Sequence, residues 1–356
     1  MSCLTLLGFW GCLSLSGRKT VYRSAVETLR ERLASLEQDE EIVARAEQLA
    51  SKYVFIHVHQ ALRYLALLGS EAEKLLETSE DSIMKTIRVN TLLTSVEELA
   101  ERLEEKGAKT RSHPYIWYGL VVEETPYPIG ALHEYMQGLY TIQGPASMMV
   151  VPALAPESAK RIADMCAGAG VKTSQIAQHN TAAAIIATDI NRRKLLALKN
   201  NMSRLAVFNV TALHMDARWL TKLGTFDAIL LDAPCSGEGL LPFKRGRWPR
   251  SFNDILSRVE LQLELLDAAL DALAPGGAMV YATCSISVEE NEYVISTLLE
   301  NRGDFEVEEP GYTAGSPGIT KYLDLDLDPS VAKCRRFFPH RNATEGFTIC
   351  RLLKTG

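Results

Sequence analysis

The sequence predicts an α/β protein with a parallel, doubly wound sheet, preceded by a small α+β unit and by N-terminal helices. Beyond residue 131, short apolar runs alternate with helical segments, which is typical of a parallel sheet covered by helices. A compact strand–helix–strand pattern comes before that region, and leucines at helical spacing come before the pattern. We expect four segments: an apolar extension 1–17, a helical region 18–80, a small α+β domain 81–130 and a large α/β domain 131–356.

Composition limits the class of protein. The chain has 356 residues, of which 47% are hydrophobic, enough for sizeable cores. Its net charge of -6 excludes a generally basic nucleic-acid coat, so any nucleic acid must be held by local basic patches. The seven cysteines are odd in number and form no C-x-x-C pair. We therefore expect no disulfide framework, no metal site and a reducing, cytoplasmic location.

The first 17 residues are apolar and carry no charge. They lack the basic region of a signal peptide and are shorter than the roughly 20 apolar residues that span a bilayer. We expect no membrane association and interpret this stretch as a tail from a misassigned start codon.

The elements before the large domain are predicted from the spacing of apolar residues and from the position of prolines. Apolar residues at helical spacing predict helices between about residues 21 and 80. A strand over 86–90, a helix over 96–103 and a strand over 117–122 form the small α+β domain. The proline-containing stretch 125–130 marks its boundary.

Four apolar runs of the large domain predict parallel strands, and each run ends in an aspartate. They cover 161–164, 183–189, 210–216 and 226–232, and end at Asp164, Asp189, Asp216 and Asp232. Ligands bind beyond the carboxyl ends of such strands. Four carboxylates at that edge favour a nucleoside-shaped cofactor.

A glycine-containing turn follows Asp164. It fits neither a P-loop nor a complete G-x-G-x-x-G, so by itself it is equally consistent with a tight turn. Asp189 lies 21 residues beyond Gly168, near the offset at which an acidic residue reaches ribose hydroxyls. Asp216 could accept from an adenine amino group or cap the next helix. Together with the thiols described next, these features favour S-adenosylmethionine over NAD.

Two cysteines follow buried strands at the same edge. Cys235 lies in Asp-Ala-Pro-Cys-Ser-Gly and Cys284 in Thr-Cys-Ser. A thiolate that adds to carbon 6 of cytosine makes carbon 5 reactive toward a methyl donor, and Asp232 could bond the ring's N3 or amino group. The alternative is that these thiols are small buried residues, as we expect for Cys166, Cys334 and Cys350.

These motifs resemble those of the Nol/Nop/Sun family of RNA (cytosine-5) methyltransferases over roughly residues 80–354. The two cysteine motifs, 49 residues apart, are its most specific part. The stretches 88–91, 336–340 and 346–347 resemble its N- and C-terminal motifs. The resemblance implies a Rossmann-like class I methyltransferase fold, an RNA-recognition-like unit within 83–124 and S-adenosylmethionine as cofactor. It also implies that Cys284 is the nucleophile and that Cys235 helps to release the methylated product.

The resemblance further implies cofactor contacts from the turn and from the acidic strand ends. The residues concerned are Cys166, Ala167, Gly168, Ala169, Gly170, Val171, Lys172, Asp189, Lys194, Asp216 and Asp232. The turn departs from the family's Cys-Ala-Ala-Pro-Gly-Gly-Lys-Thr at Gly168, Ala169 and Val171, and a valine at a glycine position is costly if φ is positive there. Lys172 is retained, so we expect the cofactor to bind.

Two basic stretches interleaved with aromatic residues suit contacts to RNA phosphates and bases. The basic residues are Lys244, Arg245, Arg247 and Arg250 in the first stretch, and Arg336 and His340 in the second. A solvated loop is the alternative for each. Because a target cytosine must be unpaired or flipped into the site, we expect RNA as the substrate, tRNA in preference to rRNA, and a monomeric enzyme.

Two competing interpretations remain. In a DNA cytosine-5 methyltransferase the Pro-Cys thiol is the nucleophile, which would exchange the roles of Cys235 and Cys284. A catalytically weak RNA-binding or assembly factor would keep the fold, and the altered turn is its one support.

Overall fold

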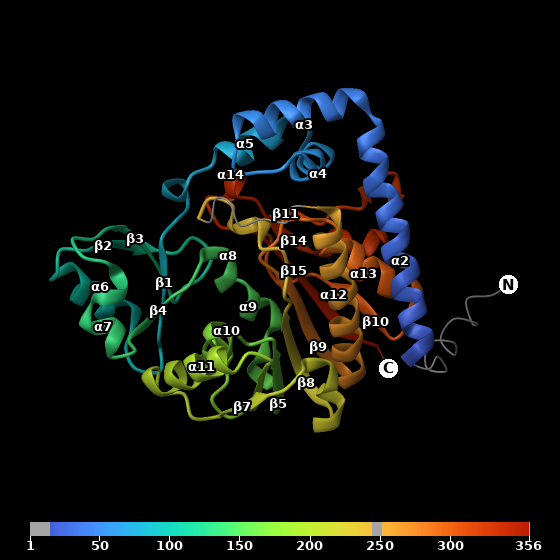
Figure 1. Cartoon of the computed structure of the whole chain (residues 1–356). Helices are drawn as coiled ribbons and strands as arrows, with labels where there is room; N and C mark the ends of the chain where they lie inside the picture. The colour runs from blue at the N-terminus through green and yellow to red at the C-terminus, as the bar shows by residue number, and fades with distance from the viewer. Residues whose placement is uncertain (1–14, 244–250, 356) are drawn as a thin grey trace.

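The computed structural model describes residues 15–243 and 251–355 (Figure 1). Its N-terminal region consists of helices α2 (Leu15–Ser35), α3 (Glu40–Lys52), α4 (Val58–Leu68) and α5 (Ala72–Glu77). Leu29 and Leu33 of α2 are fully buried, as the leucine spacing predicts. Within the described residues, no helix has the length and apolar character needed to cross a membrane.

The small domain is a four-stranded antiparallel sheet covered by helices. Its elements are β1 (Thr86–Val89), α6 (Val96–Glu104), β2 (Lys109–Ser112), β3 (Gly119–Glu124), α7 (His133–Met136) and β4 (Tyr140–Ile142). The strand order is β2-β3-β1-β4. The structure confirms the strands β1 and β3 and the helix α6. The sequence did not reveal β2, which is polar and largely exposed, or β4, which has only three residues.

The large domain is built on a nine-stranded sheet with the order β11-β14-β15-β9-β8-β5-β6-β7, in which β10 also pairs with β15. Strands β5 to β9 are parallel, which confirms the predicted doubly wound sheet. They are β5 (Arg161–Met165), β6 (Ala184–Asp189), β7 (Val210–His214), β8 (Phe226–Asp232) and β9 (Leu273–Thr283). Strand β7 ends two residues before Asp216, so this aspartate follows the strand instead of closing it.

The other half of the large sheet is antiparallel, which the alternation of strands and helices did not predict. Strand β15 runs antiparallel to β9, and β10 and β14 run antiparallel to β15. These edge strands are β10 (Phe305–Glu308), β11 (Ser316–Pro317), β14 (Arg335–Phe337) and β15 (Phe347–Lys354), with the short hairpin β12 (Lys321–Tyr322) and β13 (Leu325–Asp326) and helix α14 (Pro339–Asn342).

Helices cover both faces of the sheet, so two hydrophobic cores form. One core packs α9 (Val150–Leu154), α10 (Val171–His179) and α11 (Arg192–Arg204) on one face, with α8 (Pro145–Met148) beside α9. The other packs α12 (Phe252–Ala272) and α13 (Glu292–Asn301), and α2 lies along α12 (Figure 1). The N-terminal helices therefore extend the second core and do not form a separate domain.

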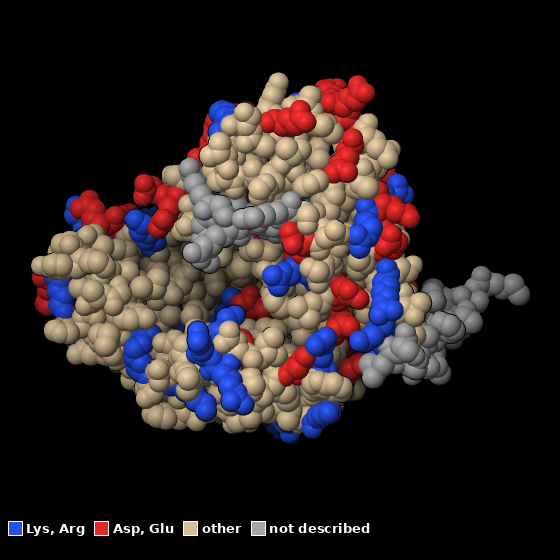
Figure 2. Space-filling view, viewed as in Figure 1, with Lys and Arg blue, Asp and Glu red and all other residues tan. Residues whose placement is uncertain are grey.

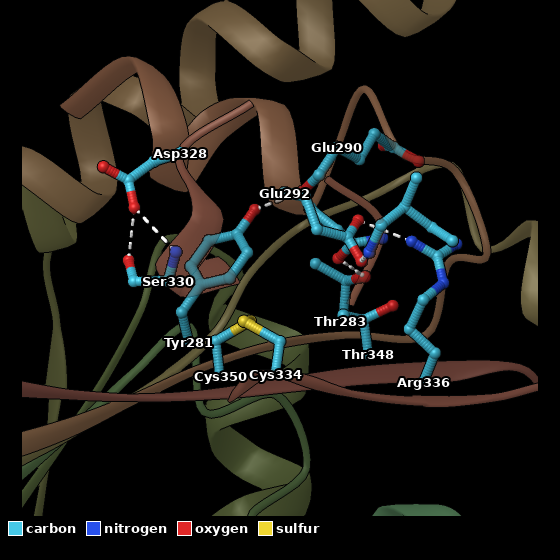
Figure 3. The surroundings of a disulfide bond; sticks show 12 residues. Tyr281, Thr283, Glu290, Glu292, Asp328, Ser330, Cys334, Arg336, Thr348 and Cys350 are labelled. Carbon is cyan, nitrogen blue, oxygen red and sulfur yellow. Dashed lines mark hydrogen bonds and ion pairs between the residues drawn. A yellow bond between two sulfur atoms is a disulfide. The ribbon is translucent and has the colours of Figure 1, made fainter. Parts of the chain in front are cut away.

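A disulfide joins Cys334 to Cys350 in the antiparallel half (Figure 3). Cys350 belongs to β15. Cys334 directly precedes β14, the strand that pairs with β15. Both residues are completely buried, as expected, but the expectation that they are unpaired is wrong. The two cysteines are 16 residues apart and become neighbours only because β14 and β15 pair, a pairing that the sequence pattern did not show.

Candidate active site

A cleft with a volume of about 1700 Å³ opens where the parallel strands end, between the large sheet and the small domain. It is visible as the central hollow of the space-filling view (Figure 2). Strands β5, β6 and β8 bring Asp164, Asp189 and Asp232 to its wall, and the segments after β7, β8 and β9 add Asp216, Cys235 and Cys284. The structure thus brings together the acidic strand ends and both candidate thiols.

The turn after β5 is shaped by its glycines and by Asp189. The backbone N–H of Gly168 donates to Asp189 Oδ2 at 2.9 Å. Gly170 has a φ of 81°, and a Cβ there would lie 2.7 Å from Leu198 Cγ, so glycine is required. Val171 begins α10 and is not among the residues with positive φ. The penalty considered for valine at this position therefore does not apply.

The carboxylates of the cleft differ in their surroundings. Burial raises the pKa of Asp164 to about 7, although Thr173 Oγ1 donates to its Oδ2 at 2.5 Å. Its other oxygen is buried without a hydrogen-bond partner. Asp216 caps the 3-10 helix 217–223 through the N–H of Arg218, and hydrogen bonds from Arg218 lower its pKa. The capping alternative for Asp216 is therefore observed, while the residue still lines the cleft.

These residues fit S-adenosylmethionine. The buried, unpartnered oxygen of Asp164 needs a donor, and a carboxylate oxygen such as those of Asp189 can accept more than one hydrogen bond. Ribose hydroxyls and an amino group are donors of the required kind, and an acidic wall attracts a sulfonium. Lys194 lines the same cleft. Among residues 15–243 and 251–355, no group of side chains could hold a metal ion.

The two thiols lie side by side at one end of the cleft. Cys235 Sγ and Cys284 Sγ are 3.4 Å apart, and both residues are partly exposed. The hydrogen bond with Cys284 and burial raise the pKa of Cys235 well above its usual range, so Cys235 keeps its proton. Lys172 Nζ lies 2.7 Å from Asp232 Oδ2 and 5.2 Å from the centre of the Phe347 ring.

Lys172 is a buried cation directed at this end of the cleft. Burial lowers its pKa, but Asp232 and then Cys284 outweigh burial, so its pKa lies above the ordinary value. An ammonium that remains charged beside the thiols favours a negative charge on sulfur. The arrangement is therefore suited to covalent chemistry by one thiolate.

Buried polar residues contact the two segments that follow β8 and β9 and carry Cys235 and Cys284, which we call the cysteine loops. Gly239 donates its N–H to the carbonyl of Cys284 at 3.0 Å. Glu290 accepts from the N–H and the hydroxyl of Ser236 at 2.7 and 2.5 Å. Three further residues were not predicted from the sequence: Glu238, Glu289 and Glu290, which are completely buried. A signal existed in the acidic run that follows the Cys284 motif, but such runs usually lie on solvated surfaces.

The predicted RNA-binding residues are only partly placed. Lys244, Arg245, Arg247 and Arg250 lie outside the described residues. Arg336 is 1% exposed and donates to Glu292 and to the carbonyl of Ile286. His340 is nearly buried against Glu71. The side chains of Arg336 and His340 are turned inward toward Glu292 and Glu71, so neither is presented on an exposed surface, and their contact with RNA stays a prediction.

Other basic residues border the cleft. They are Lys85, Arg192, Lys194, Arg218 and Arg258. Lysine and arginine side chains gather along the lower rim of the hollow in Figure 2. Only Lys194 of this group was singled out from the sequence, because the five residues come from distant segments.

Comparison with known proteins places the chain in a family. Residues 151–353 match the model of the 16S rRNA methyltransferase RsmB/F, and residues 62–129 match the ferredoxin-like domain of RsmF/B-like methyltransferases. The human 28S rRNA (cytosine(4447)-C(5))-methyltransferase is 40% identical over 294 residues, which cover 80% of this chain and 36% of the human protein. The chain thus spans about a third of the length of that relative.

Solved structures agree. A methyltransferase homologue from Pyrococcus horikoshii is 34% identical with a TM-score of 0.78, over 89% of this chain and 99% of that one. NSun6 from the same organism, solved with SFG, is 27% identical with a TM-score of 0.72, over 82% of this chain and 97% of that one. The Rossmann-like fold and the resemblance suggested by the cysteine motifs are confirmed: the chain belongs to the RsmB/F family of methyltransferases.

Proposed function

We propose that this chain is an S-adenosylmethionine-dependent RNA (cytosine-5) methyltransferase, with Cys284 as the nucleophile and Cys235 assisting release of the product. The proposal rests on one observation above all. Two free thiols lie 3.4 Å apart beside the Lys172–Asp232 ion pair, at the end of a cleft lined by carboxylates. A cytosine-5 methyltransferase needs this juxtaposition of a thiolate and a cofactor cleft.

We assign different roles to the two thiols. The hydrogen bond with Cys284 and burial raise the pKa of Cys235, so Cys235 keeps its proton, and we propose Cys284, which interacts electrostatically with Lys172, as the attacking sulfur. Its addition to carbon 6 of cytosine forms a C–S bond and makes carbon 5 nucleophilic. Asp232 would bond the ring's N3 or amino group, and Phe347 offers a ring face beside Lys172. S-adenosylmethionine, held by Asp164, Asp189 and Asp216, would supply the methyl group.

Product release requires two bonds to break. Cys235 Sγ lies 3.4 Å from Cys284 Sγ and can donate its proton to the departing sulfur as the C6–S bond breaks. The Cys235 thiolate so formed can accept the proton from carbon 5, and the electrons of the C5–H bond form the C5–C6 double bond that restores the aromatic ring. That role explains why a second thiol stands beside the first.

We propose rRNA as the substrate class ahead of tRNA. The sequence alone favoured tRNA, whereas the human relative is named as a 28S rRNA methyltransferase. The phosphates would lie along the basic rim of the cleft, which includes Arg192, Lys194 and Arg258.

A monomer working in the cytoplasm remains part of the proposal. The buried disulfide removes the argument from cysteine usage, so the location rests on the RNA substrate alone.

The competing interpretations are less well supported. The DNA-type mechanism needs Cys235 as the thiolate, although Cys235 retains its proton more firmly than a free thiol. The assembly-factor interpretation drew on the altered turn, yet Val171 starts a helix without positive φ.

The test is incubation of the purified protein with tritiated S-adenosylmethionine and either rRNA or tRNA, followed by nucleoside analysis. We expect label in 5-methylcytidine from rRNA. Label from tRNA alone would reverse the substrate assignment, and cofactor binding without label in either pool would contradict the proposed activity.

A further inference from the structure

We propose that Arg63, on helix α4 of the N-terminal region, is a positioning residue that holds the two cysteine loops together from behind. The N-terminal helices would then be part of the catalytic machinery and more than an accessory to folding. The inference rests on the proposed function for its consequence in catalysis. Its structural core, the spacing of the two thiols, can be tested without RNA.

Arg63 joins both cysteine loops with one guanidinium. Its Nη1 and Nη2 donate to the two carboxylate oxygens of Glu238 at 2.8 and 3.0 Å. Its Nε donates to Glu289 at 2.8 Å, and Nη2 donates also to Ser287 at 2.8 Å. Glu238 follows Cys235 by three residues, and Ser287 and Glu289 follow Cys284 within five. The forked geometry of arginine suits such a bridge, which a lysine ammonium cannot reproduce.

The bridge is continued toward the sulfurs by direct ties between the loops. The residue after Glu238, Gly239, donates to the carbonyl of Cys284. A Cβ at Gly239 would lie 2.0 Å from the carbonyl oxygen of Gly346, so this contact tolerates no side chain. On the other loop, Glu290 holds Ser236, the neighbour of Cys235. A shift of either loop would therefore change the distance between the two thiols.

The electrostatics of the cluster depend on Arg63. The Arg63 side chain is 3% exposed, and those of Glu238 and Glu289 are 0% and 1% exposed. Burial alone would raise the pKa of Glu289, but the charge of Arg63 and hydrogen bonds from Arg63 and Ser287 lower it to about 2. Without the guanidinium, the two buried carboxylates would lose their counter-charge and keep only neutral donors, such as Ser287 and Tyr322 for Glu289. The loops would then separate, or the carboxylates would take up protons.

A matched control exists on the same side of the sheet. Arg302 is also 3% exposed and donates to Asp271 and Asp304 at 2.9 and 2.6 Å, besides Asp267. These partners lie on α12 and after α13, away from the cysteine loops. Replacing Arg302 thus removes a comparable buried cation without touching the loops that carry Cys235 and Cys284.

The experiment compares the full-length variants Arg63→Met, Arg63→Lys and Arg302→Met with the wild-type chain. Unfolding temperature and calorimetric affinity for S-adenosylmethionine are measured first. The rate at which dibromobimane bridges two thiols is then followed by fluorescence, with a Cys235→Ser variant as the background. Methylation kinetics give kcat and KM for RNA. Arg63→Lys keeps the charge and provides a folded variant if Arg63→Met fails to fold.

We expect the bridging rate and kcat to fall about tenfold or more in Arg63→Lys and further in Arg63→Met, because small misplacements of reacting groups are costly. Cofactor affinity should stay within about twofold, since the cofactor wall is separate. Arg302→Met should lower the unfolding temperature without changing the bridging rate or kcat.

An unchanged bridging rate in both folded Arg63 variants would overturn the inference. So would an equal fall in Arg302→Met, because the effect would then be one of general stability. If the wild-type chain methylates no RNA while bridging still depends on Arg63, the proposed function fails and the positioning role stands.

Discussion

Two cysteine pairs flank strand β9, and they are chemically opposite. Cys235 and Cys284 are free, partly exposed and lie where β8 and β9 end at the cleft. Cys334 and Cys350 are completely buried and joined by a disulfide (Figure 3). Cys350 faces Tyr281 in the ladder between β15 and β9, so the strand itself fixes its position. Cys284 lies just past the end of that ladder, where loops and a neighbouring cation control the sulfur.

Proximity of two sulfur atoms therefore does not decide their function. A cysteine pair buried between two paired strands stabilises the fold, whereas a pair at the carboxyl ends of parallel strands is accessible to ligands.

The largest effect is expected at the cleft pair. Cys284→Ala should reduce methylation by about 10⁴-fold or more, because removal of a covalent nucleophile has effects of this size. Cys235→Ala should leave adduct formation possible but slow its resolution, so a protein–RNA complex should accumulate on denaturing gels. A complex with Cys284→Ala, and none with Cys235→Ala, would assign the nucleophile to Cys235 and support the DNA-type mechanism.

Loss of the disulfide between Cys334 and Cys350 should lower the stability of the fold and leave methylation activity unchanged. Removing the disulfide with Cys334→Ala and Cys350→Ala should lower the free energy of unfolding by about 3 kcal/mol, given the loop of 16 residues that it closes. Urea unfolding of the wild-type and double-variant chains measures this difference. At temperatures where both remain folded, kcat should change less than about twofold. A loss of activity comparable to that of Cys284→Ala would show that the disulfide belongs to the active site.

The comparison also explains what the sequence could reveal. The motifs around Cys235 and Cys284 are contiguous and follow apolar strands, so the edge of the sheet, the acidic wall and the meeting of the two thiols there were predictable. The disulfide was not, because it depends on an antiparallel pairing of β14 with β15 that has no local pattern. Arg336 looked like a basic surface residue, yet a buried partner, Glu292, turns it inward. Charged residues mislead wherever tertiary structure supplies a buried counter-charge.

Acid should weaken the contribution to stability of Glu289, which supports the loop that carries Cys284. The pKa of Glu289 is lowered from 4.5 to about 2, so its contribution to stability is full above the unfolded value and is lost as pH falls. The stability difference between the wild-type chain and Glu289→Gln should shrink by roughly 1 kcal/mol between neutral pH and about pH 3.5. Urea titrations at several pH values measure it. A difference that grows on acidification would mean that Glu289 is protonated in the folded state.

The smallest effect is expected at Cys166, a third free thiol that lines the same cleft. Burial, followed by the charges of Asp189 and Asp164, raises the pKa of Cys166 to about 12. At pH 8 only about 10⁻⁴ of this thiol would be ionised, so iodoacetamide should modify it far more slowly than a free cysteine. Peptide mass spectrometry over a time course measures the rates, with Cys284 in the same sample as the internal comparison. If Cys166 reacted as fast as Cys284, then exposure to the cleft alone would control reactivity, and Lys172 would have no role in selecting the nucleophile. Slow reaction at Cys166 and fast reaction at Cys284 would show instead that burial and neighbouring charge together select among thiols that share one cleft.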